Sequence, residues 1–107
     1  MVTQALPPRD VAEKLKRGED FILLDCREPE ELQIARIERA RHIPMGDIPV
    51  RIKELDPQKE IVVFCHHGRR SANVCAFLRE HAYSRVLNMT GGIAAWSADV
   101  DPRVPQY

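Results

Sequence analysis

The sequence predicts an α/β domain with a mostly parallel sheet, and three observations lead to that prediction. The chain has 107 residues, which is the length of one compact domain. Short apolar runs alternate with segments in which apolar residues recur at helical spacing. The runs are apolar on both faces, as in strands that are buried in a parallel sheet. Such an alternation of strands and helices is typical of α/β domains.

Four apolar runs are predicted to be strands. FILLDC at residues 21–26 is a continuous run, and IVVFC at residues 61–65 is rich in β-branched residues. SRVLNM at residues 84–89 is a weaker candidate. ARHIP at residues 40–44 is a short fourth run, which Pro44 stops.

The segments between these runs are predicted to be helices. PPRDVAEKLKRG at residues 7–18 has a proline near its start and a glycine as its stop signal. EPEELQIARI at residues 28–37 carries two glutamates in its first turn, where the helix dipole favours acids. A short helix is expected over residues 50–55, before Pro57.

The strongest helical pattern is RRSANVCAFLREHAY, at residues 69–83. One apolar stripe runs along it and consists of Val74, Phe77, Leu78 and Ala82. A last helix is expected to follow Gly91 and Gly92. The tail at residues 98–107 has two prolines and no apolar stripe, so it is expected to wrap over the surface or to fray.

Chemistry is expected in the loop CHHGRRS, at residues 65–71, because it joins a predicted strand to the strongest helix. Ligands of parallel sheets bind beyond the carboxyl ends of the strands. Cys65 needs activation, since a free cysteine has a pKa of about 8.5. Gly68 permits a tight loop whose backbone N–H groups turn inward, and the helix start adds partial positive charge. Both features stabilise a thiolate.

The side chains of the loop also favour an anion. Those that add formal or potential charge, or a hydroxyl donor, are His66, His67, Arg69, Arg70 and Ser71. Two arginines favour a substrate whose oxygens can be gripped in a bidentate manner. The alternative is a buried core cysteine beside a solvated turn. The coincidence of strand end, glycine, charge and helix start favours a reactive thiolate beside an oxyanionic substrate.

This loop resembles the active-site loop of the rhodanese sulfurtransferases, and other segments resemble that family in the same order. LLDCREPEEL at residues 23–32 resembles its early DVRE-x-x-E segment, and ARHIP falls where the family often has a strand ending in Ile-Pro. NMTGGIAAW at residues 88–96 resembles its closing L-x-GG-x-x-AW. The resemblance covers about residues 8–97. It implies one rhodanese-like domain in the 107 residues, with about five strands and helices on both faces of the sheet.

The resemblance implies a double displacement without a metal or an organic cofactor. Cys65 would attack the outer sulfur of thiosulfate, release sulfite and hold the sulfur as a persulfide. A thiophilic acceptor, such as cyanide or a thiol, would then take the sulfur. The backbone of residues 66–71 would cradle the persulfide. The side chains at the pocket mouth would be those of His66, His67, Arg69 and Arg70.

Two other functions remain open. The dual-specificity phosphatases of the cell cycle resemble this architecture and use a C-x5-R loop, whereas Cys65 and Arg70 have the C-x4-R spacing. The shorter loop makes a smaller cup, which suits a sulfur atom better than a phosphoryl group. The second alternative is a binding or sulfur-relay module that takes sulfur from one protein and passes it to another.

Residues outside the loop are expected to support it. Asp25 and Arg27 are interpreted as a strand-end ion pair that braces the loop from a neighbouring strand. Cys26 is expected to be a small buried hydrophobe, with a resolving cysteine for Cys65 as the alternative. Cys75 is expected to pack within its helix. Arg36 lies in ARIERA, which replaces the family's G-H-I-x-G-A, and the sequence leaves open whether it reaches the pocket.

Composition limits the partners. The formal net charge is zero, so the whole molecule offers no electrostatic reason to bind nucleic acid or an anionic membrane. No signal peptide or apolar span is apparent, and the odd count of three cysteines suits a reducing compartment. The expected protein is therefore a cytoplasmic monomer. Its partners would be a small anionic sulfur donor and a thiophilic acceptor, with a sulfur-exchanging protein as a further possibility.

Overall fold

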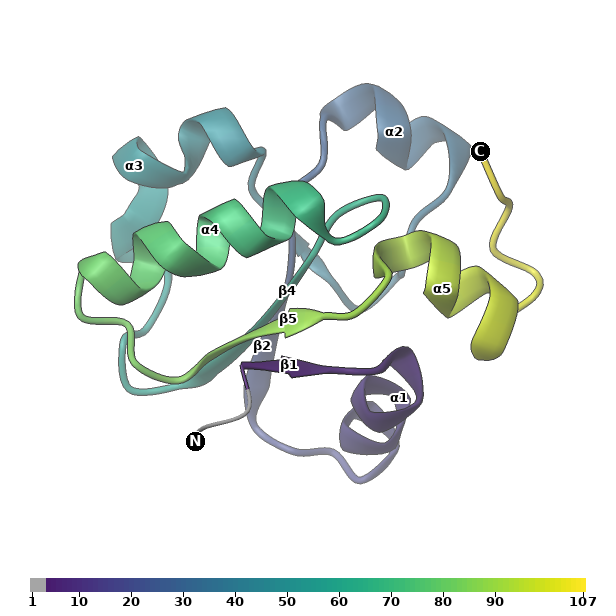
Figure 1. The fold of residues 1–107 in the computed structure, drawn as a ribbon, viewed down its shortest axis with the longest axis horizontal. Helices are drawn as coiled ribbons and strands as arrows, with labels where there is room; N and C mark the ends of the chain where they lie inside the picture. The colour runs from purple at the N-terminus through teal and green to yellow at the C-terminus, as the bar shows by residue number, and fades with distance from the viewer. Residues whose placement is uncertain (1–3) are drawn as a thin grey trace.

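A computed structural model describes residues 4–107 of the chain. Within that range one sheet has five strands in the order β1-β5-β4-β2-β3, and all its pairings are parallel (Figure 1). The strands are β1 (Ala5–Leu6), β2 (Phe21–Asp25), β3 (Arg41–His42), β4 (Glu60–Phe64) and β5 (Val86–Met89). This arrangement confirms the predicted α/β fold. The central strand, β4, leads into the loop at residues 65–71.

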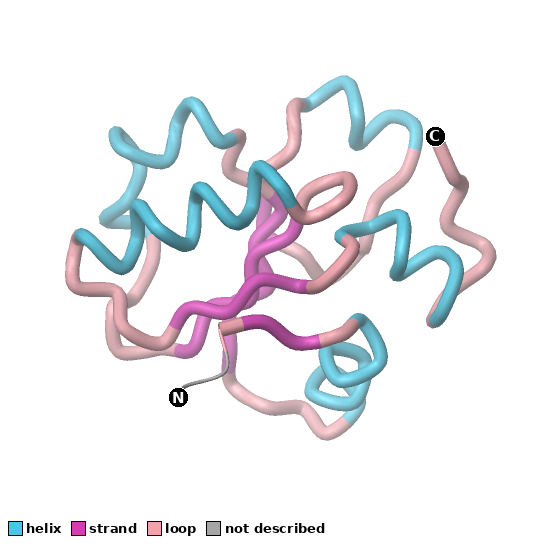
Figure 2. The backbone as a smooth tube through the Cα atoms, viewed as in Figure 1, coloured by secondary structure: helices cyan, strands magenta, loops and turns pink. Residues whose placement is uncertain are grey.

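Helices cover both faces of the sheet, as predicted (Figure 2). They are α1 (Pro8–Lys16), α2 (Pro29–Ile34), α3 (Ile48–Arg51), α4 (Arg69–Glu80) and α5 (Gly92–Asp99), with 3-10 turns η1 (Met45–Asp47) and η2 (Ile52–Glu54). One core cluster joins α3 and α4 to Ile61, Val63 and Cys65, whereas the other joins α1 and α5 to Val62 and Phe64. Alternate side chains of β4 thus point to opposite faces. Cys65 belongs to the α4 face.

Two predicted helices end earlier than expected. Ala82 was predicted to lie in the apolar stripe of the long helix, but α4 ends at Glu80 and Ala82 is exposed at φ 70°. The N–H of Tyr83 donates to Leu78 O at 3.0 Å, a closure that requires a left-handed residue just before it. Similarly, α2 ends at Ile34 because Ala35 is extended and its carbonyl accepts a hydrogen bond from Arg27 at 2.8 Å.

Strand β1 lies outside the four predicted runs and before residue 8. Ala5 and Leu6 pair with Asn88 and Met89 of β5 at the edge of the sheet. A strand of two residues is too short to show a period in the sequence. The short helix near residue 50 also begins earlier than expected, at Ile48.

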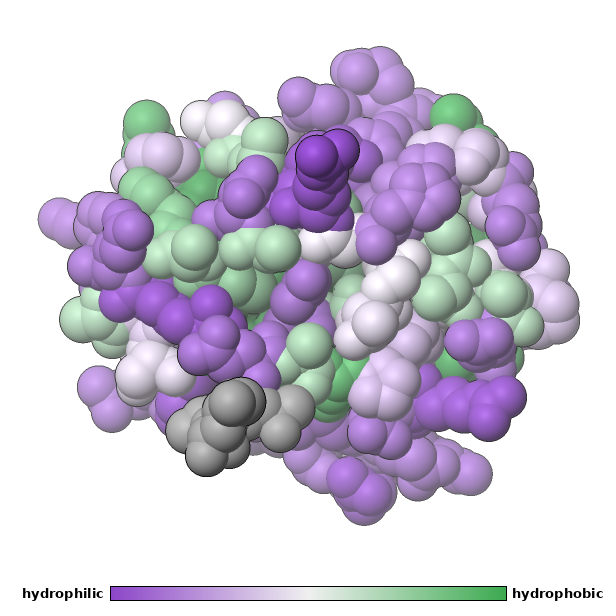
Figure 3. Space-filling model, in the orientation of Figure 1, coloured by the Kyte–Doolittle hydropathy of each residue, from purple (hydrophilic) through white to green (hydrophobic). Residues whose placement is uncertain are grey.

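In the view of Figure 3, hydrophobic side chains gather over α3 and α4, and hydrophilic side chains surround them. The large hydrophobic residues that are exposed are Ile34, Met45, Val50 and Tyr107. Over residues 4–107, no helix has the length and apolar character needed to cross a membrane.

Candidate active site

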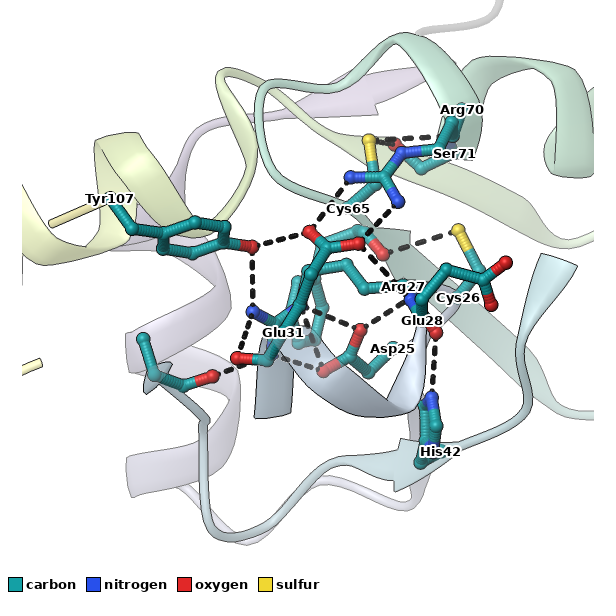
Figure 4. Close-up of polar contacts among 12 residues, drawn as sticks. Asp25, Cys26, Arg27, Glu28, Glu31, His42, Cys65, Arg70, Ser71 and Tyr107 are labelled. Atoms are coloured by element: carbon teal, nitrogen blue, oxygen red, sulfur yellow. Dashed lines mark hydrogen bonds and ion pairs between the residues drawn. The ribbon is translucent and has the colours of Figure 1, made fainter. Parts of the chain in front are cut away.

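Cys65 follows β4 directly, and its sulfur lies inside the loop that leads to α4 (Figure 4). The Sγ atom accepts hydrogen bonds from the N–H of Gly68 at 3.1 Å and the N–H of Ser71 at 3.4 Å. Gly68 has φ 105°, which turns its N–H inward and which few other residues tolerate. The loop thus directs backbone donors at one sulfur atom, next to the start of a twelve-residue helix.

The hydroxyl of Ser71 lies between Cys65 and Asn88. Its Oγ is 2.6 Å from Asn88 Oδ1 and 3.4 Å from Cys65 Sγ. A hydroxyl has one proton, and the shorter distance assigns it to Asn88. Asn88 in turn donates from Nδ2 to the carbonyl of Gly68 at 3.0 Å, which orients its amide. Ser71 therefore stabilises a thiolate when its proton turns from Asn88 to the sulfur.

The surroundings of Cys65 favour its ionised form. Burial opposes ionisation, but hydrogen bonds from the Ser71 hydroxyl and from backbone N–H groups outweigh it and lower the pKa of Cys65. The net shift is opposite for the other two cysteines, because burial dominates there and raises the pKa of Cys26 strongly and that of Cys75 to about 11. Cys65 is therefore the thiol that ionises most easily.

The start of α5 holds the loop from the other side. The N–H of Ile93 donates to Cys65 O at 2.9 Å, and the N–H of Ala94 donates to His66 O at 3.1 Å. Gly91 and Gly92 both have positive φ, and Gly92 is buried against the loop carbonyls. The two glycines of the closing segment thus allow α5 to approach the backbone of the loop.

Asp25 and Arg27 form a buried ion pair behind the loop, with Arg27 Nη2 2.7 Å from Asp25 Oδ2. Arg27 is fully buried and also donates to Ala35 O at 2.8 Å, while its own carbonyl lies 2.7 Å from His42 Nε2. The pair therefore ties β2 to the segment after α2 and to β3. That the pair supports the thiol loop stays a prediction.

The two arginines of the loop have different surroundings. Arg70 is half-buried, and its Nη1 and Nη2 lie 2.6 Å and 2.9 Å from the two carboxylate oxygens of Glu31. This bidentate pair is the main reason why the pKa of Glu31 falls to about 2. Arg69 is exposed on the first turn of α4. An anion that binds Arg70 must therefore share it with Glu31.

His66 of the loop stacks with its neighbour His67 and with Tyr107 from the tail. His66 lies between His67, at 3.9 Å between ring centroids, and Tyr107, at 3.8 Å with the ring planes 3° apart. Burial lowers the pKa of His66. Residues 4–107 contain no group of three or more histidine, cysteine or acidic side chains that could hold a metal ion.

Tyr107 and Glu31 are the site residues that the sequence analysis missed. Glu31 is the last glutamate of the segment that resembles DVRE-x-x-E, so its position in the motif was a usable signal. Tyr107 is an aromatic residue in an otherwise polar, proline-containing tail, and that contrast was the only signal for it. The tail wraps over the surface, which was one of its two expected behaviours.

The structure shows where Cys26 and Arg36 lie, two residues whose relation to the site the sequence left open. Cys26 packs in the same core cluster as Cys65, and its thiol donates to Phe64 O at 3.4 Å. Asp25 pairs with Phe64, so Cys26 and Cys65 follow adjacent strand ends. Arg36 lies at the surface, with 56% of its side chain exposed, and its Nε is 3.6 Å from Glu38.

Comparisons with known proteins agree with this architecture. The sequence matches the family described as "Rhodanese-like domain" over residues 8–99. The chain is 43% identical over 91 residues to YtwF of Bacillus subtilis, which has a provisional sulfurtransferase name, with 85% of this chain and 87% of that protein covered. It is 39% identical over 87 residues to a sulfurtransferase of Allochromatium vinosum, with 81% of each covered.

Another relative is longer, and one solved structure is very similar. YrkF of Bacillus subtilis has a provisional sulfur-carrier name and is 33% identical over 89 residues, which are 83% of this chain but 48% of that protein. The crystal structure of a rhodanese-related protein from Thermoplasma volcanium superimposes with a TM-score of 0.83 at 30% identity, covering 97% of this chain and 99% of that one. The chain therefore belongs to the rhodanese-like domain family.

Proposed function

We propose that this chain is a sulfurtransferase that carries sulfane sulfur as a persulfide on Cys65. The donor is thiosulfate or a similar small anion, and the acceptor is cyanide or a thiol. The observation that carries the proposal is the position of Cys65 Sγ, which accepts hydrogen bonds from the N–H groups of Gly68 and Ser71. These donors favour the thiolate that a nucleophile requires.

The reaction has two balanced steps. In the first, the Cys65 thiolate attacks the outer sulfur of thiosulfate, a new S–S bond forms, and sulfite leaves with the electron pair of the broken S–S bond. In the second, the acceptor attacks the outer sulfur of the persulfide and the thiolate of Cys65 leaves. With cyanide the product is thiocyanate. The second step returns negative charge to Cys65 Sγ, where the backbone donors of the loop stabilise it.

Sulfur relay between proteins is the second candidate. It is supported by the longer relative YrkF, whose name indicates a sulfur carrier and of which this chain spans about half. The persulfide chemistry on Cys65 is the same in both cases, and only the donor and acceptor differ. A phosphatase fits less well, because the loop is one residue shorter than C-x5-R and its smaller cup suits a sulfur atom better than a phosphoryl group.

The test is intact-protein mass spectrometry after incubation with thiosulfate. Wild type should gain the mass of one sulfur atom, and cyanide should remove it. Cys65→Ser should gain nothing, whereas Cys75→Ser, which changes a buried thiol of the same core cluster, should load like wild type. A folded wild type that loads only from a protein persulfide would support the relay. Hydrolysis of an aryl phosphate without sulfur loading would contradict both forms of the proposal.

A further inference from the structure

The last residues of the sequence are fixed against the domain beside the site. Val104 is buried in the core cluster of α1 and α5, and its carbonyl accepts a hydrogen bond from Ser97 Oγ at 2.5 Å. The N–H of Val104 also donates to Asp101 O at 3.1 Å. These contacts anchor the segment, which then runs along the molecule to the neighbourhood of α2 (Figure 1).

Tyr107 contacts three elements of the site at once. Its ring stacks on His66, the residue directly after Cys65. Its hydroxyl donates to Glu31 Oε2 at 2.6 Å and accepts from Arg27 Nη1 at 2.8 Å (Figure 4). Burial, followed by the contact with Glu31, raises the pKa of Tyr107 to about 12, so the hydroxyl keeps its proton. Tyr107 is still 38% exposed, so it contacts His66, Glu31 and Arg27 from the solvent side.

Glu31 connects Tyr107 to Arg70, at the far end of the loop. Its carboxylate, which accepts from the Tyr107 hydroxyl, also holds Arg70. Glu31 itself is fixed in α2, because it accepts from the N–H of Glu28 at 3.1 Å in a capping box. Tyr107, Glu31 and Arg70 therefore make a continuous rim from His66 to the first turn of α4. Cys65 lies next to the Arg70 end of this rim and is only 1% exposed (Figure 4).

We propose that Tyr107 is a specificity-determining residue, which restricts the size of the molecules that reach Cys65. The inference rests on the proposed function in so far as those molecules are sulfur acceptors. A small acceptor such as cyanide reaches the sulfur past the rim. A bulky thiol requires the ring to leave His66 and the hydroxyl to leave Glu31 and Arg27. Those contacts are all non-covalent, so Tyr107 slows bulky acceptors without excluding them.

The test is alkylation of Cys65, which requires no sulfur donor and therefore works even where the proposed function fails. Rates are measured with iodoacetamide and with a fluorescein-bearing iodoacetamide for wild type, Tyr107→Phe and Tyr107→Ala. Both reagents need the same thiolate, so any change in the pKa of Cys65 cancels in the ratio of the two rates. Each variant is first shown to be folded by its thermal unfolding.

Tyr107→Ala should raise the rate ratio of bulky to small reagent by about tenfold or more, the size expected when one aromatic contact and two hydrogen bonds no longer resist opening. Tyr107→Phe keeps the ring over His66 and should stay closer to wild type. Equal ratios in all three folded proteins would overturn the proposal. In an enzyme that loads sulfur, Tyr107→Ala should likewise raise kcat/KM for glutathione relative to cyanide. An unchanged ratio of kcat/KM for glutathione to kcat/KM for cyanide would overturn the proposal that Tyr107 selects among sulfur acceptors.

Discussion

Gly92 lies so close to Cys65 that a Cβ atom at position 92 would be 2.5 Å from the carbonyl oxygen of Cys65. Its φ of 62° is also unfavourable for any residue with a side chain. This approach lets the next residue, Ile93, donate its N–H to the same carbonyl. The glycine therefore determines how the backbone of the thiol loop is held.

Gly92→Ala should destabilise the protein by roughly 2–4 kcal/mol, since left-handed strain and a backbone clash act together. Urea unfolding measures the change. Gly18→Ala is the matched control, because Gly18 has φ 67° and open space around it, and it should cost roughly 1–2 kcal/mol from strain alone. Equal losses in the two variants would show that the contact with Cys65 adds nothing.

The sequence could predict the centre of this site because its features are local. A strand, a cysteine, a glycine and a helix start follow one another within about ten residues, and the periods of strand and helix position them. The glycine pair before α5 was visible for the same reason. The rule that ligands of parallel sheets bind beyond the carboxyl ends of the strands then indicated which loop to consider.

The contacts within the rim of the site could not be predicted, because they join residues far apart in the chain. Arg70 and Glu31 are 39 residues apart, and Tyr107 and Glu31 are 76 apart. No spacing rule relates such pairs, and each side chain alone is typical of an exposed position. Arg69 and Arg70 were accordingly treated as equivalent, although only Arg70 points toward α2.

Cys65 should be the cysteine that alkylates in the native protein at neutral pH. Burial raises the pKa of Cys26 and Cys75, so both remain neutral thiols, whereas the pKa of Cys65 is lowered. Peptide mapping after limited iodoacetamide treatment should find the label on Cys65, and all three cysteines should react in urea. Early labelling of Cys26 would instead support its alternative role as a resolving cysteine.

Ser71→Ala should shift the alkylation of Cys65 to higher pH. The Ser71 hydroxyl is a hydrogen-bond donor available to the thiolate, and a lost bond to the charged form raises a pKa. The alkylation rate at pH 7 should fall by about tenfold or more, because one hydrogen bond to a charged group is worth roughly 1.5–3 kcal/mol. Tyr83→Phe removes another buried hydroxyl, whose hydrogen bonds go to the carbonyls of Ile52 and Leu55, and should leave the profile unchanged.

The Glu31–Arg70 pair should make stability depend on pH in the acid range. The pKa of Glu31 falls from 4.5 to about 2 on folding, mainly through Arg70. The carboxylate therefore stabilises the fold fully above about pH 4.5, and this contribution is lost as the pH falls through about 2. Glu31→Gln should remove part of the acid-induced loss, measured by urea unfolding at pH 6 and pH 3.

The matched control for that change is Glu54→Gln, which breaks the exposed pair with Arg51. At pH 6 it should cost little, because solvent screens exposed pairs. Glu31→Gln should cost more, roughly 1–2 kcal/mol, since its partner contacts are bidentate and partly buried. Equal costs would mean that the Glu31–Arg70 pair is no stronger than an ordinary surface pair.

Arg70→Ala should raise KM for thiosulfate by roughly tenfold, which corresponds to about 1.4 kcal/mol of lost anion binding. Arg69→Ala should have a smaller effect, because Arg69 is exposed whereas Arg70 is held at the loop by Glu31. Steady-state kinetics with cyanide as acceptor separates KM from kcat for both variants. If the two substitutions raised KM equally, the positioning of Arg70 by Glu31 would have no part in donor binding. If neither raised KM, the backbone donors of the loop would hold the anion without either guanidinium.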